Sequence, residues 1–187
     1  GRVGGGGGGG GGGVGVGCHW CAVSWALVAA ALVGIGAALA PALIAADPTV
    51  PYIAELAGRC EGMLIVDEAY ADFAETNCIE LVKKNENILV TRTLSKSYGL
   101  AGLRFGFLVA QPQVIAELVK IKDSYNCDAL SIAAATAAMG CQDWLREVVT
   151  KMNATRSRLE KELTKLGFDV TPSHANFVWC THPSGEH

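Results

Sequence analysis

One stretch of the chain gathers residue types that can carry out covalent chemistry. Lys96 lies beside Ser95 and eight residues before Arg104, and about thirty positions earlier Asp67 and Tyr70 follow an apolar run. A lysine amine can join an aldehyde as an imine that an incoming amine then exchanges. A carboxylate beside a ring nitrogen favours the protonated ring, and a guanidinium grips a phosphate with two parallel hydrogen bonds.

These are the groups that pyridoxal phosphate requires from a protein. Lys96 would hold the aldehyde, Asp67 the ring nitrogen, and Arg104 the phosphate. The Ser95 hydroxyl would add a donor to the phosphate, and the Tyr70 hydroxyl could reach the phenolic oxygen of the ring. A lone lysine is usually a solvated charge, so the prediction depends on the combination.

From about Pro51 to Cys180 the sequence resembles the histidinol-phosphate aminotransferases, fold-type-I pyridoxal-phosphate enzymes of histidine biosynthesis. The matching stretches are residues 63–73, 92–107 and, more weakly, 173–177. The resemblance implies that Lys96 is the catalytic, imine-forming lysine. It also implies cofactor contacts by the other members of the set, which are Asp67, Tyr70, Ser95 and Arg104.

The same resemblance implies a reaction and partners. It implies transamination of histidinol phosphate with 2-oxoglutarate to imidazole acetol phosphate and glutamate, in a cytoplasmic homodimer that acts on small molecules. A plastid location is an alternative. Two other functions stay open: a threonine-phosphate decarboxylase of the same fold, and a non-catalytic fragment.

A nucleotide hydrolase is the main rival from the residues alone. Four apolar residues before Asp67-Glu68 also resemble a magnesium-binding strand end. That class requires a glycine-rich loop ending in Gly-Lys-Ser or Gly-Lys-Thr. The first lysine is Lys83, and no such loop follows it.

Composition divides the chain into unequal parts. Thirteen of the 23 glycines fall within residues 1–17, which we expect to be disordered. Residues 22–46 carry no charge and are long enough for a membrane span or signal sequence, but their flanks carry no lysine cluster. We therefore expect residues 1–46 to be disordered or not native to the fold, with membrane association or a divergent buried element as alternatives.

Charge and cysteine content exclude other classes. The net charge is −3 with no basic stripe, which argues against nucleic acid. Seven irregularly spaced cysteines are typical of reduced intracellular thiols, and we expect no metal site.

Strand and helix patterns alternate from Pro51. We expect strands at residues 63–66, 88–91 and 104–110, and helices at 53–60, 78–84, 113–121, 131–140 and 143–166. Short strands at 168–170 and 176–180 would follow. This succession predicts an α/β fold: a partial fold-type-I large domain over residues 47–140, with a mainly parallel sheet covered by helices, and a linking helix with the start of a small C-terminal domain over 141–187.

Some family features have no counterpart in this sequence. The family has an asparagine before the ring-binding aspartate, whereas the first asparagine here is Asn77. The family's ring-stacking aromatic residue and its substrate-binding arginine also lie outside the matched stretches. We therefore expect the chain, as a partial one, to bind the cofactor weakly and to have little transaminase activity alone.

Overall fold

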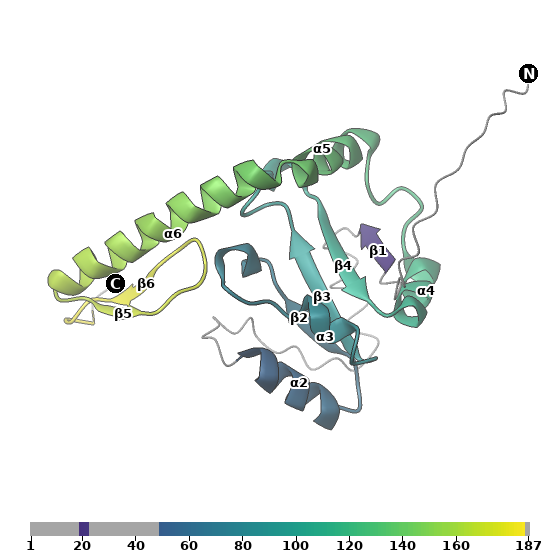
Figure 1. Ribbon diagram of the computed structural model, residues 1–187, viewed down its shortest axis with the longest axis horizontal. Coiled ribbons are helices and arrows are strands. Elements are labelled where there is room, and N and C mark those ends of the chain that lie inside the picture. The colour runs from purple at the N-terminus through teal and green to yellow at the C-terminus, as the bar shows by residue number, and fades with distance from the viewer. Residues whose placement is uncertain (1–18, 23–48, 186–187) are drawn as a thin grey trace, which may run out of the picture.

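The computed structural model describes residues 19–22 and 49–185 (Figure 1). The strands are β1 (His19–Ala22), β2 (Leu64–Asp67), β3 (Ile88–Thr93), β4 (Gly106–Ala110), β5 (Asp169–Thr171) and β6 (Trp179–Thr181). The α-helices are α2 (Thr49–Arg59), α3 (Ile79–Val82), α4 (Pro112–Ile121), α5 (Ala129–Gly140) and α6 (Gln142–Lys165). Two 3-10 turns, η1 (Ala71–Phe73) and η2 (Ala101–Leu103), complete the described elements. The α/β class is confirmed.

The larger sheet has the strand order β1-β4-β3-β2. β2 and β3 run parallel, with Asp67 opposite Thr91. β4 runs antiparallel to both β3 and β1, so the described sheet is mixed, and the expected mainly parallel direction is wrong for these strands. The reason lies in the connections. A parallel neighbour needs a crossover, which α3 supplies between β2 and β3, whereas only a loop and η2 join β3 to β4.

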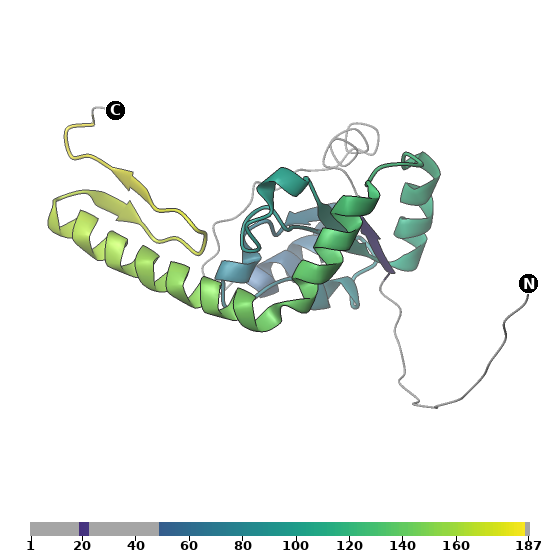
Figure 2. The same ribbon diagram turned by 90° about the horizontal axis from the view of Figure 1, so that it is seen from above.

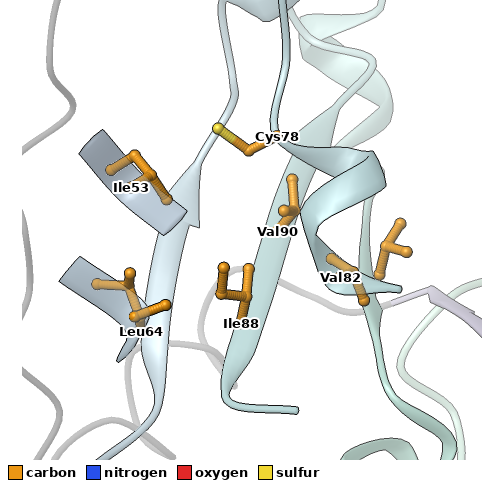
Figure 3. Close-up of a cluster of buried hydrophobic side chains, with 8 residues drawn as sticks. Ile53, Leu64, Cys78, Val82, Ile88 and Val90 are labelled. Carbon is orange, nitrogen blue, oxygen red and sulfur yellow. The ribbon is translucent and has the colours of Figure 1, made fainter. Parts of the chain in front are cut away.

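One face of this sheet packs against α2 and α3. The shared core is apolar and contains Ile53, Ala57, Leu64, Cys78, Val82, Ile88, Val90 and Val109. Figure 3 shows Ile53 of α2 and Leu64 of β2 on one side of Ile88 and Val90 of β3, with Val82 of α3 on the other. Ile88 and Val90 alternate with Leu89, which faces the opposite side, as the two-residue period of a strand requires.

The opposite face is covered by α4. Leu89, Leu108 and Ala110 pack there against Ile115 of the helix. Burial on both faces explains why the first half of β3, Ile88 to Val90, is continuously apolar. A third cluster, Leu94, Phe105 and Ala135, brings α5 against the segment between β3 and β4.

The long helix α6 extends beyond the sheet in both views and carries the β5–β6 hairpin along its far half (Figures 1 and 2). It begins directly after Cys141, which separates it from α5 at the expected domain junction. The leucines of α6 and of its C-cap are only partly covered: Leu145 is buried, but Leu159 and Leu166 are exposed. The division into domains at residue 141 stays a prediction.

The segment 1–46 lies outside the described residues except for 19–22. Those four residues form β1, paired with β4. Among the described residues, no helix combines the length and the apolar character that crossing a bilayer requires.

The junction between α2 and β2 depends on one side chain. Nδ2 of Asn87 donates to the carbonyl oxygens of Ala57, Cys60 and Gly62 at 2.9, 3.2 and 3.2 Å. Asn87 immediately precedes β3, so this amide ties the end of α2 and the entry to β2 to the central strand.

We expect Asn87→Ala to lower the free energy of unfolding by about 1–3 kcal/mol, because part-buried carbonyls lose their donor. Asn87→Asp should cost more, since a carboxylate would face carbonyl oxygens. Urea unfolding measures both, with Glu86→Gln as a neighbouring exposed control expected to change stability by less than about 0.5 kcal/mol. An Asn87→Asp protein as stable as the control would contradict the assignment.

Candidate active site

The predicted site residues collect at one edge of the sheet. Asp67 is the last residue of β2, and Lys96 lies three residues beyond the end of β3. Because β2 and β3 are parallel, both segments leave the sheet at the same edge. Oδ1 of Asp67 accepts hydrogen bonds from the Ala69 backbone at 3.1 Å and from Oγ1 of Thr91 at 3.3 Å, so the carboxylate is oriented by the neighbouring strand.

The segment carrying Lys96 is a closed loop. The Leu94 amide donates to the Phe105 carbonyl at 3.2 Å, and the Leu100 amide donates to the Leu94 carbonyl at 3.0 Å. Within it the Gly99 amide donates to the Lys96 carbonyl at 3.1 Å, and Gly99 has a φ of 68°. Glycine adopts this left-handed conformation without the steric cost that a Cβ would bring. Leu94, 1% exposed, anchors the loop in the core.

Lys96 and Tyr70 are in direct contact. Nζ of Lys96 lies 4.9 Å from the centroid of the Tyr70 ring, within the range of a cation–π interaction. The other neighbour of Tyr70 is Phe177, whose ring meets it edge-on at 5.4 Å. The β5–β6 hairpin therefore reaches the same site, which agrees with the weak sequence match over residues 173–177.

Ser95 and Arg104 lie in the same loop, and the side chain of each forms a hydrogen bond with a residue two or three positions earlier in the chain. The Ser95 hydroxyl accepts from Oγ1 of Thr93 at 3.0 Å, and Nη1 of Arg104 donates to the Ala101 carbonyl at 3.0 Å. Arg104 is exposed and has a φ of 54°, the one positive φ among the described non-glycine residues. A non-glycine residue held there is a sign of local strain that functional loops often carry.

The sequence interpretation missed a set of buried polar residues beneath these loops. Glu68, Asp72, Arg92 and Ser97 are joined by hydrogen bonds and ion pairs. The available signal was Arg92: an arginine in a strand whose other residues are all buried requires carboxylate partners nearby.

Cys78 borders this set. Its backbone amide donates to Oε1 of Glu68. Burial, and then the charge of Glu68, raises the pKa of the Cys78 thiol to about 12. A thiol in such surroundings stays protonated and inert, so it is a structural group rather than a nucleophile.

Known proteins resemble this chain in sequence and in structure. The sequence model of the family described as aminotransferase class I and II matches residues 43–187. The chain belongs to this family. The resemblance to histidinol-phosphate aminotransferases is confirmed, since the chain is 74% identical over 137 residues to that enzyme from Rhodopirellula baltica, and 55% identical over 132 residues to that from Geotalea daltonii.

These matches cover 73% and 71% of this aminotransferase chain, and the chain spans 38% of the length of each relative. A solved structure of histidinol-phosphate aminotransferase from Sinorhizobium meliloti, in complex with pyridoxal-5'-phosphate, superposes with a TM-score of 0.64 at 32% identity. That alignment covers 69% of this chain and 36% of the other. The fold-type-I architecture is therefore confirmed for this part of the fold.

The backbone and the guanidinium of Arg104 can be tested separately. We expect Arg104→Gly to have a free energy of unfolding about 1 kcal/mol higher than Arg104→Ala, because only glycine adopts the left-handed conformation without strain. Urea unfolding of the two variants, neither of which has the guanidinium, isolates the backbone effect. Equal midpoints would mean that residue 104 does not hold a positive φ in solution.

The raised pKa of the Cys78 thiol predicts that the folded protein loses stability at alkaline pH. Below pH 9 the thiol is neutral in both the folded and unfolded states; above it the unfolded thiol ionises while the folded one stays protonated to about pH 12. Stability should therefore fall across this window, by at most about 1.4 kcal/mol per pH unit from this group. Cys78→Ala should have a shallower slope in urea unfolding between pH 9 and 11; an unchanged slope would contradict the shift.

Proposed function

We propose that this chain carries the cofactor site of a pyridoxal-phosphate-dependent histidinol-phosphate aminotransferase. The amino group of histidinol phosphate would pass to 2-oxoglutarate, which leaves imidazole acetol phosphate and glutamate. The names of the relatives support the substrate class. The homodimer and the cytoplasmic location stay predictions.

The observation that carries the proposal is the meeting of Lys96 and Tyr70 at the edge where β2 and β3 end. Among the described residues, Lys96 forms no ion pair with a carboxylate, so its amine is available for other chemistry. The carboxylate of Asp67 is oriented by Thr91 on the same edge. These groups suit pyridoxal phosphate.

Each residue has a defined task in the proposal. When bound, the cofactor supplies an electron sink for the bond broken at the substrate carbon. Lys96 would hold it covalently and then move the proton at that carbon through Nζ. Asp67 would keep the ring nitrogen protonated, and the Tyr70 hydroxyl would donate to the phenolic oxygen.

The phosphate would be bound by the loop between β3 and β4. Ser95 can reorient its hydroxyl from Thr93, and Arg104 is exposed and free to exchange one bond to its own loop for a phosphate. A guanidinium binds phosphate more strongly than a neutral carbonyl, because both charges contribute. The strained backbone of Arg104 would then be compensated by the bound anion.

Covalent attachment is the first test. We expect pyridoxal phosphate, trapped by borohydride reduction, to label the peptide that contains Lys96 in the wild-type chain. Lys96→Ala should lose this label. Lys151→Ala, which removes an exposed lysine of α6, should keep it. A label spread evenly over the exposed lysines in the wild type would contradict a cofactor site at Lys96.

A test of the substrate class requires a complete enzyme, because the chain spans 38% of the length of its Rhodopirellula baltica relative. We suggest replacing the aligned 137 residues of the Rhodopirellula baltica enzyme by those of this chain. This chimera should form glutamate from histidinol phosphate and 2-oxoglutarate, and its Lys96→Ala form should lose at least about 10³-fold in rate. Release of carbon dioxide from threonine phosphate instead would favour the decarboxylase, and loss of both reactions would favour a non-catalytic segment.

A further inference from the structure

A buried ionic network lies beneath the two loops of the candidate site. Oε2 of Glu68 accepts from both Nε and Nη2 of Arg92 at 2.8 Å. Nη1 of the same guanidinium donates to Oδ1 of Asp72 at 2.8 Å. The side chains of Arg92 and Glu68 are 12% and 7% exposed, so little water screens the pair.

The network continues into the lysine loop. Ser97, 2% exposed, donates its hydroxyl to Oδ2 of Asp72. Ser97 directly follows Lys96, Glu68 directly follows Asp67, and Asp72 lies two residues after Tyr70. An unbroken series of polar contacts therefore joins the loop that bears Asp67 and Tyr70 to the loop that bears Lys96.

The composition of the network argues for positioning rather than for bulk stability. Two carboxylates surround one guanidinium, and removing such charges from water offsets most of their mutual attraction. Two hydrogen bonds from one guanidinium to the single oxygen Oε2 of Glu68, in contrast, fix the orientation of the guanidinium as well as its distance. Asp72 uses one oxygen for each neighbour, so its position is determined from both sides.

Lys96 itself needs such support. Its side chain has four rotatable bonds, and its contact in the site is with the face of the Tyr70 ring. The place of the amine is therefore set by the backbone at residues 96–97. Misplacement by about 1 Å can reduce a rate by about 10²-fold.

We propose that Glu68, Arg92, Asp72 and Ser97 form a clasp that holds the Lys96 loop against the Asp67–Tyr70 loop, with Ser97 as the positioning residue for Lys96. The role of the clasp in positioning Lys96 rests on the proposed function, because only that function requires the Lys96 amine to be held in place. The existence of the clasp can be tested without any cofactor.

The variants separate the clasp from general stability. Ser97→Ala removes only the link to the lysine loop. Asp72→Ala removes both of its contacts, whereas Asp72→Asn keeps them, since its amide oxygen can accept from Arg92 and its amide nitrogen can donate to Oγ of Ser97. Val82→Ala is the matched control: it leaves a cavity in the α3 core, where Val82 is 0% exposed, and does not touch the clasp.

Hydrogen exchange of the full chain, without cofactor, is the first measurement. The amides of Gly99 and Leu100 report the loop, since they donate to the Lys96 and Leu94 carbonyls. In Ser97→Ala and Asp72→Ala we expect these amides to exchange about tenfold faster, with the amides of β3 unchanged. Asp72→Asn should stay near the wild type, and Val82→Ala should speed exchange in β3 and the loop together.

The second measurement is the borohydride-trapped label at Lys96. We expect Ser97→Ala to form it at least about tenfold more slowly than Val82→Ala. In Ser97→Ala, loop amides that speed up only together with those of β3, or labelling no slower than in Val82→Ala, would overturn the clasp. A wild-type chain that takes no label at Lys96, while Ser97→Ala still loosens residues 97–100 alone, would contradict the proposed function and support the clasp.

Discussion

β2 and β3 run parallel and in register, and the arrangement of the whole site depends on this pairing. Asp67 pairs with Thr91, so the two strands end at one edge and release their following loops side by side. The α2 and α3 helices hold the pair from one face, and α4 covers the other. Core packing thus determines where the polar residues emerge, although none of the core side chains belongs to the site.

The change from parallel to antiparallel pairing at β4 determines where the loop between β3 and β4 lies. A strand that returned by a crossover helix would carry the chain to the opposite edge before β4 began. Instead β4 starts at the edge where β3 ends, and the loop between them stays there over its whole length. Ser95, Lys96 and Arg104 therefore remain at the site edge. The direction of β4 keeps the predicted phosphate and lysine groups together.

Strands β2, β3 and β4 of the main sheet were predictable because their signals are local, whereas β1 was not predicted. The apolar run that ends at Asp67, and the one from Ile88, identify two buried strands with a polar residue at the exit. The conformation of Arg104 was not predictable, since its positive φ arises from closing the loop between Leu94 and Phe105. Nor could spacing alone show which nearby carboxylates pair with Arg92, because that choice depends on how η1 turns Asp72 back toward β3. The antiparallel direction of β4 was not predictable for a similar reason: periodicity marks a strand but does not identify its partner.

The five predicted cofactor residues fall between positions 67 and 104 of the sequence, within two loops that the clasp joins. The proposed cofactor attachment would thus depend on a short, locally closed part of the fold. The contact of Phe177 with Tyr70 shows that the distant β5–β6 hairpin also reaches this site. Arg156 of α6 supports that hairpin by donating to the Ala175 carbonyl at 2.7 Å. The proposed attachment at Lys96 would therefore depend on one edge of one sheet, whereas the proposed turnover would also depend on elements that reach this edge from elsewhere in the chain.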